Sequence, residues 1–141
     1  MNSYWKNHFD SMSRQFDGSL FKQVGKTING QEVSEHHVNV IFEKIAKVLR
    51  LNAKDSVVDL CCGNGLITRQ LAPFVKEVVG VDFSSGLIDS AEKYNSFNNI
   101  KFNDKEVVGL YFCPITEVSK ILKQKYIPIA SALKYSLPYC L

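Results

Sequence analysis

The stretch VVDLCCGNGL, residues 57–66, decides the fold of this chain. Its apolar start ends in Asp59, two cysteines follow, and Gly63-Asn64-Gly65 leads into another apolar run. The β-branched valines favour a buried strand. Because glycine lacks a Cβ, the two glycines permit a sharp turn and a close approach of the backbone to a ligand. The stretch therefore predicts a strand, a tight glycine loop and a helix.

Strand and helix patterns alternate on both sides of this stretch. Apolar residues recur at three- and four-residue steps behind Ser34, a good helix N-cap. Pro73 is expected to stop the helix that follows the glycine loop. The expected order is a helix at 35–50, a strand at 57–60, a helix at 66–72, a strand at 78–81, a helix within 83–97 and a strand at 100–102.

This alternation predicts an α/β fold, a Rossmann-like parallel sheet with helices on both faces. Ligands bind such sheets beyond the carboxyl ends of the strands. Asp59 and Asp82 fall at that edge, since each lies at the end of a predicted strand. We expect residues 35–141 to form this domain and residues 1–34 to form a helical cap segment before it.

The cap segment carries an aromatic helix pattern over residues 4–21. Its apolar face would hold Trp5, Phe9, Met12 and Phe16. Such a face is expected to pack against the core or its edge, and a lid over a ligand pocket is the alternative.

The composition is that of a one-domain globular protein. The 141 residues are 45% hydrophobic and 22% charged, with a net charge of +3. The basic residues are spread out, so no nucleic-acid footprint is expected. The N-terminus lacks the apolar core of a signal peptide, and no uncharged apolar run approaches the roughly 20 residues of a membrane helix. We therefore expect a cytoplasmic protein with no nucleic-acid or membrane partner.

The four cysteines follow no metal-binding pattern. Cys61, Cys62, Cys113 and Cys140 show no C-x-x-C spacing and no partnering histidine motif. Adjacent cysteines rarely bridge each other, and a reducing compartment keeps them as thiols. We expect small buried or half-buried residues and no metal site.

The glycine loop and the next acid together indicate a nucleoside-containing cofactor. The loop opens a helix, whose free N–H groups favour an anionic group. Asp82 follows Gly63 by 19 positions, at the tip of the next predicted strand. A carboxylate there can accept hydrogen bonds from both hydroxyls of an adenosine ribose.

Other nucleotide loops fit less well. In the dinucleotide fingerprint G-x-G-x-x-G, counted from Gly63, the third glycine would fall on Thr68. A dinucleotide loop also has no need of an acid such as Asp59 at the end of the first strand. The phosphate loop G-x-x-x-x-G-K-[ST] fails because Arg69 stands six positions after Gly63 and no second glycine precedes it.

The combination resembles the class I S-adenosylmethionine-dependent methyltransferases. VVDLCCGNG is similar to their first motif, usually written apolar-apolar-Asp-Leu-Gly-Cys-Gly-x-Gly, and VVGVDFSSGLIDSAEK is similar to the segment that follows. The resemblance covers about residues 24–102, and its N-terminal part, including VGKTINGQEVS, is the least specific.

The resemblance implies a role for each residue of the loop and the strand ends. Gly63, Asn64 and Gly65 would form the loop under the methionine part of S-adenosylmethionine, and Asp59 would orient that loop and help receive the ammonium group. Asp82 would hold the ribose hydroxyls, Phe83 would lie against the adenine, and Ser84 is expected among the cofactor-binding residues. Cys61 stands where the family more often has glycine, and the substitution narrows the expected pocket.

The leading hypothesis is therefore an S-adenosylmethionine-dependent methyltransferase with an unknown small-molecule acceptor. The alternative is a non-catalytic remnant that binds the cofactor or a partner subunit, and the weaker alternative is an NAD-dependent oxidoreductase, against which Thr68 argues. No residue is assigned as catalytic.

The C-terminal third is short for this family. Only 39 residues follow Phe102, whereas the four further strands and their helices need roughly 75. We expect a fourth strand in EVVGLYF (106–112), a helix at 115–125 and a short fifth strand in IPIASAL (127–133). Asn103 and Asp104 are candidates for the residue near the adenine amino group. The sheet is expected to be incomplete after about residue 102 and to self-associate through an exposed edge.

Overall fold

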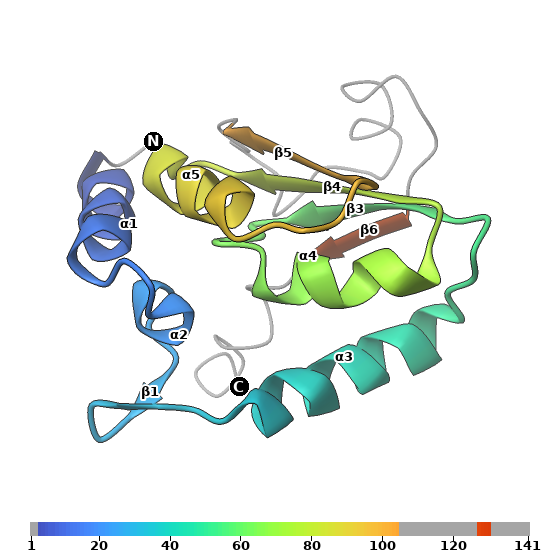
Figure 1. The fold of residues 1–141 in the computed structure, drawn as a ribbon, viewed down its shortest axis with the longest axis horizontal. Helices are drawn as coiled ribbons and strands as arrows, with labels where there is room; N and C mark the ends of the chain where they lie inside the picture. The colour runs from blue at the N-terminus through green and yellow to red at the C-terminus, as the bar shows by residue number, and fades with distance from the viewer. Residues whose placement is uncertain (1–2, 105–126, 131–141) are drawn as a thin grey trace, which may run out of the picture.

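The computed structural model describes residues 3–104 and 127–130, which form a small α/β unit (Figure 1). Its main sheet has four parallel strands in the order β5-β4-β3-β6. The strands are β3 (Ser56–Leu60), β4 (Glu77–Asp82), β5 (Ile100–Asp104) and β6 (Ile127–Ala130). All three strands expected between residues 57 and 102 are present.

The glycine loop lies where the order of the strands reverses. The chain runs outward from β3 through β4 to β5, and β6 then pairs with the other side of β3, with Val57 opposite Ile127. Such a switch point, at the carboxyl ends of the strands, is where open parallel sheets bind ligands. The segment expected to be a fifth strand therefore takes the position next to the first strand of the main sheet.

The described helices of the sheet domain cover one face of the sheet (Figure 1). They are α3 (Glu35–Leu49), α4 (Leu66–Leu71) and α5 (Ser85–Lys93). An apolar cluster fills the space between α3, α4 and the sheet, with Val57, Leu71 and Val78 at 0% exposure. Pro73 lies in a 3₁₀ turn, Ala72–Phe74, directly after α4, as expected. The strand expected at 106–112 and the helix expected at 115–125 lie outside the described residues.

The N-terminal segment folds as α1 (Ser3–Gln15), α2 (Leu20–Gln23) and a hairpin of β1 (Thr27–Ile28) with β2 (Gln31–Glu32). The helix pattern over 4–21 is thus interrupted, because Gly18 takes a φ of +87° that an α-helix does not allow. Phe16 lies in the resulting turn rather than on the helix. Trp5 is 53% exposed and stacks on Phe9 instead of entering the core.

Candidate cofactor site

The glycine loop joins β3 to α4 with three residues in the left-handed region. Cys61, Gly63 and Gly65 have φ values of 54°, 57° and 75°. Glycine adopts this region freely, whereas a residue with a Cβ does so at a cost of roughly 1–2 kcal/mol. The backbone conformation at residue 61 is therefore more favourable for glycine than for the cysteine that is present.

The loop is tied to the end of β4 by the carboxylate of Asp82. The backbone N–H of Gly63 donates to Asp82 Oδ2 at 2.8 Å, and the N–H of Ser84 donates to Oδ1 at 3.0 Å. Asp82 is 3% exposed, and this burial raises the pKa of its carboxyl. The backbone hydrogen bonds lower that pKa in part, while the negative charge of Asp10 raises it further. A largely buried acid thus stands beside the glycine loop at the switch point.

Asp59, at the end of β3, is held from α4. Thr68 Oγ1 donates to Asp59 Oδ2 at 2.7 Å, and both residues are 0% exposed. Thr68 is the residue at the position of the missing third glycine. Its hydroxyl takes part in the close packing between helix and strand that a glycine would otherwise permit.

Lys26 contributes a positive charge near Asp59 that the sequence did not reveal. Burial lowers the pKa of its ammonium to about 8, and the charge of Asp59 opposes that decrease. Lys26 belongs to the N-terminal segment, next to the β1–β2 hairpin. The carboxyl end of β3 therefore has charges of both signs within electrostatic reach.

The two cysteines of the loop are free thiols. Burial, with the charges of Asp82 and Asp59 adding to it, raises the pKa of Cys61 to about 11. Cys62 is buried, and its pKa is raised well above the usual value for the same reasons. Both thiols are protonated near neutral pH, which makes them poor nucleophiles. Within residues 3–104 and 127–130, no group of three or more His, Cys, Asp or Glu side chains could hold a metal ion.

The N-terminal segment closes over the loop. Val24 lies so near Gly63 that a Cβ there would come 3.0 Å from Val24 Cγ1. Asn64 Nδ2 donates to the carbonyl of Leu20 at 2.7 Å and to Gln23 Oε1 at 2.8 Å. Gln23 is 0% exposed and also accepts a hydrogen bond from Ser90 Oγ on α5. The sequence did not single out Gln23, because an isolated glutamine carries no periodic signal.

Phe83 and Ser84 lie between β4 and α5. Phe83 is half-buried, and its ring meets that of Phe9 edge-on at 5.9 Å. Ser84 is fully buried and caps α5 by accepting from the N–H of Leu87 at 3.2 Å. Its hydroxyl donates to Asp10 Oδ1 at 2.5 Å. Both hydrogen bonds of this hydroxyl therefore stay within the protein.

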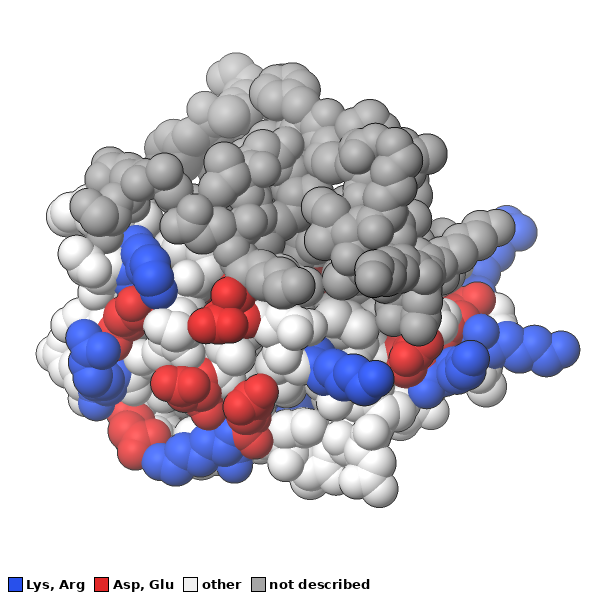
Figure 2. Space-filling view, turned by 90° about the horizontal axis from the view of Figure 1, so that it is seen from above, with Lys and Arg blue, Asp and Glu red and all other residues white. Residues whose placement is uncertain are grey.

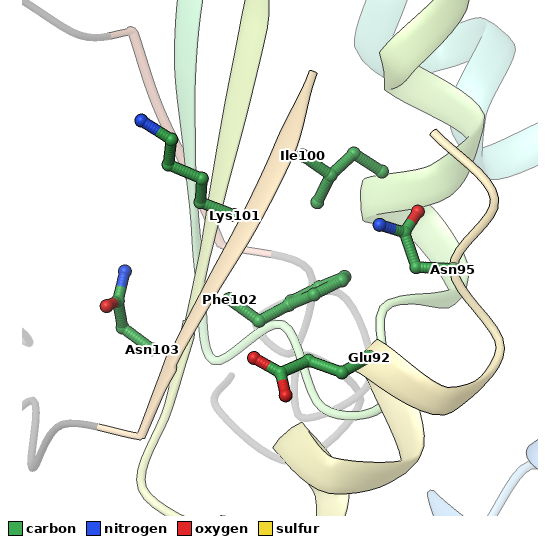
Figure 3. Close-up of a pocket in the computed structure, with 6 residues that line it drawn as sticks. All are labelled: Glu92, Asn95, Ile100, Lys101, Phe102 and Asn103. Atoms are coloured by element: carbon green, nitrogen blue, oxygen red, sulfur yellow. The ribbon is translucent and has the colours of Figure 1, made fainter. Parts of the chain in front are cut away.

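Asn103 and Asp104 are the last two residues of β5 rather than part of a loop. Asp104 lies opposite Asp82 in the register of the sheet, at the same edge. A groove of about 460 Å³ runs along β5 instead of over the glycine loop (Figure 3). Figure 3 shows Phe102 on the side of the strand where Glu92 and Asn95 lie and Lys101 on the opposite side. The ring of Phe102 reaches the glycine loop, since a Cβ at Gly65 would come 2.8 Å from Phe102 Cζ. The groove is lined by Glu92, Asn95, Ile100, Lys101, Phe102 and Asn103, and it contains neither acid of the candidate site.

Comparisons with known proteins agree with this geometry. Residues 57–116, which begin at β3, match the family described as "Methyltransferase domain". An S-adenosylmethionine-dependent methyltransferase from Anabaena variabilis has a similar structure, with a TM-score of 0.58 and 20% identity over 91% of this chain and 46% of that one. Residues 57–116 therefore carry part of a class I S-adenosylmethionine-dependent methyltransferase domain. The predicted family, α/β fold and cofactor class are thereby confirmed.

Other methyltransferases share parts of the chain. Phosphoethanolamine N-methyltransferase 1 of Haemonchus contortus, solved with phosphoethanolamine and S-adenosylhomocysteine, aligns with a TM-score of 0.57 and 15% identity over 91% of this chain and 31% of that one. The 23S rRNA (uracil(1939)-C(5))-methyltransferase RlmD of Vesicomyosocius okutanii is 38% identical over 96 residues, 63% of this chain and 20% of that protein. The enzyme of the same name from Aliivibrio fischeri is 33% identical over 119 residues, 80% of this chain and 25% of that protein.

The chain thus spans only a fifth to a quarter of the length of these curated methyltransferases. Two of these relatives are 23S rRNA methyltransferases, so the expectation of no nucleic-acid partner is unsupported. In the part of the chain that the structure describes, no helix has the length and apolar character needed to cross a membrane.

Proposed function

We propose that the chain binds S-adenosylmethionine across the carboxyl ends of β3 and β4 and transfers its methyl group to an acceptor. The observation that carries this proposal is the contact of Gly63 N with the Asp82 carboxylate at 2.8 Å. That contact brings the glycine loop and the acid of the next strand together at the switch point of the sheet. An acid and a glycine loop in this arrangement suit a ligand with a ribose at one end and an amino acid at the other.

The residues fit the two ends of this cofactor. Asp82 offers carboxylate oxygens that can accept from the ribose hydroxyls, and the half-buried ring of Phe83 offers a face for the adenine. The loop Gly63-Asn64-Gly65 would lie under the methionine part. Asp59, held by Thr68, would orient this loop and receive the ammonium group. Cys61 would line the loop without reacting, because its pKa is raised to about 11.

Bound S-adenosylmethionine supplies a methyl group on a sulfonium, which is already an activated leaving group. The protein's contribution is then to align the acceptor, to exclude water and to hold the cofactor rigidly. The closure of Val24 over Gly63 and the buried contacts of Asn64 serve the last of these tasks. A general base is needed only where the acceptor must lose a proton, and we assign none.

Calorimetric titration with S-adenosylmethionine, S-adenosylhomocysteine and NADH tests the proposal. We expect the first two to bind and NADH not to bind, and we expect Asp82→Ala to abolish binding. The matched control is Asp89→Ala, which removes an exposed acid from α5. Absence of S-adenosylmethionine binding to the wild-type chain would contradict the proposal, and so would NADH binding that Asp82→Ala removes.

For the acceptor we propose a small molecule, with a uracil base in RNA as the second candidate. On the face shown in Figure 2, basic and acidic side chains of the described residues are interspersed, and no extended basic surface is visible. The RNA candidate rests on the similarity to the RlmD relatives, which are 23S rRNA methyltransferases. Their shared segment contains the cofactor loop, which every acceptor class needs, so the acceptor does not follow from the identity.

Transfer of a labelled methyl group separates these candidates. Label recovered in total RNA, and lost in Asp82→Ala, would establish the RNA acceptor and contradict the small-molecule proposal. Label recovered in a low-molecular-weight extract would support the latter. Cofactor binding without any transfer would favour the non-catalytic alternative.

A further inference from the structure

Asp10, on α1, reaches the start of α5 although 74 positions separate it from Ser84. Its Oδ1 accepts from Ser84 Oγ at 2.5 Å and from the backbone N–H of Gly86 at 3.0 Å. Its Oδ2 pairs with Lys6 Nζ at 3.2 Å, and Lys6 Nζ also donates to Ser85 Oγ at 3.3 Å. One carboxylate on α1 therefore fixes the first turn of α5.

The contact continues from Ser84 to Asp82. The same residue whose hydroxyl donates to Asp10 uses its backbone N–H to hold Asp82 Oδ1 at 3.0 Å. Since Asp82 Oδ2 accepts from Gly63, a continuous path of hydrogen bonds runs from α1 to the glycine loop. Asp10 does not reach the loop itself, so any effect on a ligand there must pass through Ser84.

The two helices are packed closely where this path begins. A Cβ at Gly86 would collide with Ser13 Oγ and would lie 3.1 Å from the Cα of Asp10. Only a residue without a side chain lets α1 come this near to α5. The close packing at Gly86 and the hydrogen bonds of Asp10 both hold Asp10 against the start of α5.

We propose that Asp10 is a positioning residue for the nucleoside end of the cofactor site, acting through Ser84 on the carboxylate of Asp82. The proposal rests on the proposed function, because it concerns the same bound cofactor. In this proposal α1 does more than cover the site, because it orients the carboxylate of Asp82 that would bind the ribose.

The chain offers a matched control at the other end of the same two helices. Asp17, just after α1, accepts from Lys93 Nζ at 2.7 Å and from Tyr94 Oη at 3.0 Å, at the C-terminal end of α5. Asp17 is exposed, and it contacts the C-terminal end of α5, whereas Asp82 lies before the N-terminal end of that helix. Asp17→Ala and Asp10→Ala thus each remove one carboxylate that joins the N-terminal segment to α5, but only the second interrupts the path to Asp82.

The experiment is titration of S-adenosylhomocysteine into wild type, Asp10→Ala, Asp10→Asn, Asp17→Ala and Asp82→Ala. Asp10→Ala removes the acceptor of the Ser84 and Gly86 hydrogen bonds. We therefore expect this variant to bind S-adenosylhomocysteine about tenfold more weakly than wild type, or weaker still. Asp17→Ala should change the affinity by less than about twofold, as expected for an exposed ion pair. Asp10→Asn should restore most of the affinity, because its amide oxygen can still accept from Ser84 and Gly86.

Several outcomes would overturn the inference while leaving the proposed function intact. These are wild-type affinity in Asp10→Ala, or equal losses in Asp10→Ala and Asp17→Ala. Retained binding in Asp82→Ala would contradict both the inference and the role that the proposed function gives to Asp82. Failure of the wild-type chain to bind would instead contradict the proposed function and the inference with it.

The pH profile of Asp10→Asn adds a readout that remains available if Asp10→Ala does not fold. Several titratable groups face Asp82 or its partner Asp10. The charge of Asp10 acts on Asp82, and the charge of Asp82 acts on Cys61 and Cys62 of the loop. Lys6 pairs with Asp10, and Asp104 lies opposite Asp82 in the register of the sheet. The charge of Asp10 raises the pKa of Asp82, so its removal lowers that pKa. Binding that requires ionised Asp82 should then persist to lower pH in Asp10→Asn than in wild type. An unshifted acidic limb would contradict the influence of Asp10 on the carboxylate of Asp82.

Discussion

Thr68 donates a hydrogen bond of 2.7 Å to Asp59, and neither side chain is exposed to solvent. This contact joins α4 to the end of β3 across the glycine loop, and it forms where the dinucleotide fingerprint would place a glycine. A carboxylate this deeply buried is costly unless hydrogen-bonded or paired. Thr68 therefore contributes to both the stability of the fold and the orientation of the loop.

Thr68→Val is expected to lower the free energy of unfolding by about 1.5–3 kcal/mol, because it removes a buried hydrogen bond to a charged group. Thr68→Ser keeps the hydroxyl and loses one methyl group, which corresponds to roughly 0.8 kcal/mol. Urea denaturation of the three proteins measures both differences. No loss in Thr68→Val beside a clear loss in Thr68→Ser would show that the methyl group, and not the hydrogen bond, stabilises this position.

The sequence predicted the strand, loop and helix around Asp59 because each has a local signal. Valine runs mark β3 and β4, and two glycines mark the loop. By contrast, the contacts of Asp10 with Ser84 and of Gln23 with Asn64 join residues 74 and 41 positions apart. No periodicity encodes such pairs, so these parts of the site required the structure.

Thr68 shows the same limit within the motif itself. In the sequence, Thr68 was informative only because it stands where the dinucleotide fingerprint has its third glycine. Its presence there argued against a dinucleotide-binding site. Its hydroxyl has a partner that only the packing of α4 on β3 reveals. The pairing of β6 with β3 could not be predicted from the sequence either. The order of strands in a sheet depends on how the strands are connected and not on the composition of each strand.

Cys61→Gly is expected to stabilise the protein. Cys61 has a φ of 54°, where a side chain costs about 1–2 kcal/mol, and glycine gives back roughly 0.5–1 kcal/mol through greater freedom of the unfolded chain. The free energy of unfolding should therefore rise by about 0.5–1 kcal/mol. Cys61→Ala is the control, since it removes the thiol but keeps the Cβ. A gain as large in Cys61→Ala would show that the thiol, not the backbone, is unfavourable.

Gly80→Ala is expected to destabilise the sheet. Gly80 lies in β4, where an added Cβ would come 2.7 Å from Phe102 Cδ1 and 3.0 Å from Cys62 Sγ. Overpacking of this kind typically costs about 1–3 kcal/mol. In a Phe102→Leu background the added methyl group has more room, so the loss caused by Gly80→Ala should shrink. A double-mutant cycle measured by chemical denaturation checks the coupling, and additive effects would contradict it.

The last prediction concerns the pH dependence that Lys26 imposes on stability. Burial lowers the pKa of Lys26 from 10.5 to about 8 in the folded protein. Between these two values the unfolded chain binds more protons than the folded one, so the contribution of Lys26 to stability rises as the pH rises. Lys26→Met removes this contribution. Cys61, whose raised pKa makes its own contribution to stability fall as the pH rises, is present in both proteins, so its effect cancels in the comparison.

The difference in unfolding free energy between wild type and Lys26→Met should therefore shift in favour of wild type as the pH rises from about 8 to 10.5. Lys47→Met, which changes an exposed lysine on α3, is the matched control and should show no such trend. Denaturation curves at several pH values give the difference directly. A constant difference across this range, or a shift in favour of Lys26→Met, would contradict a lowered pKa for Lys26.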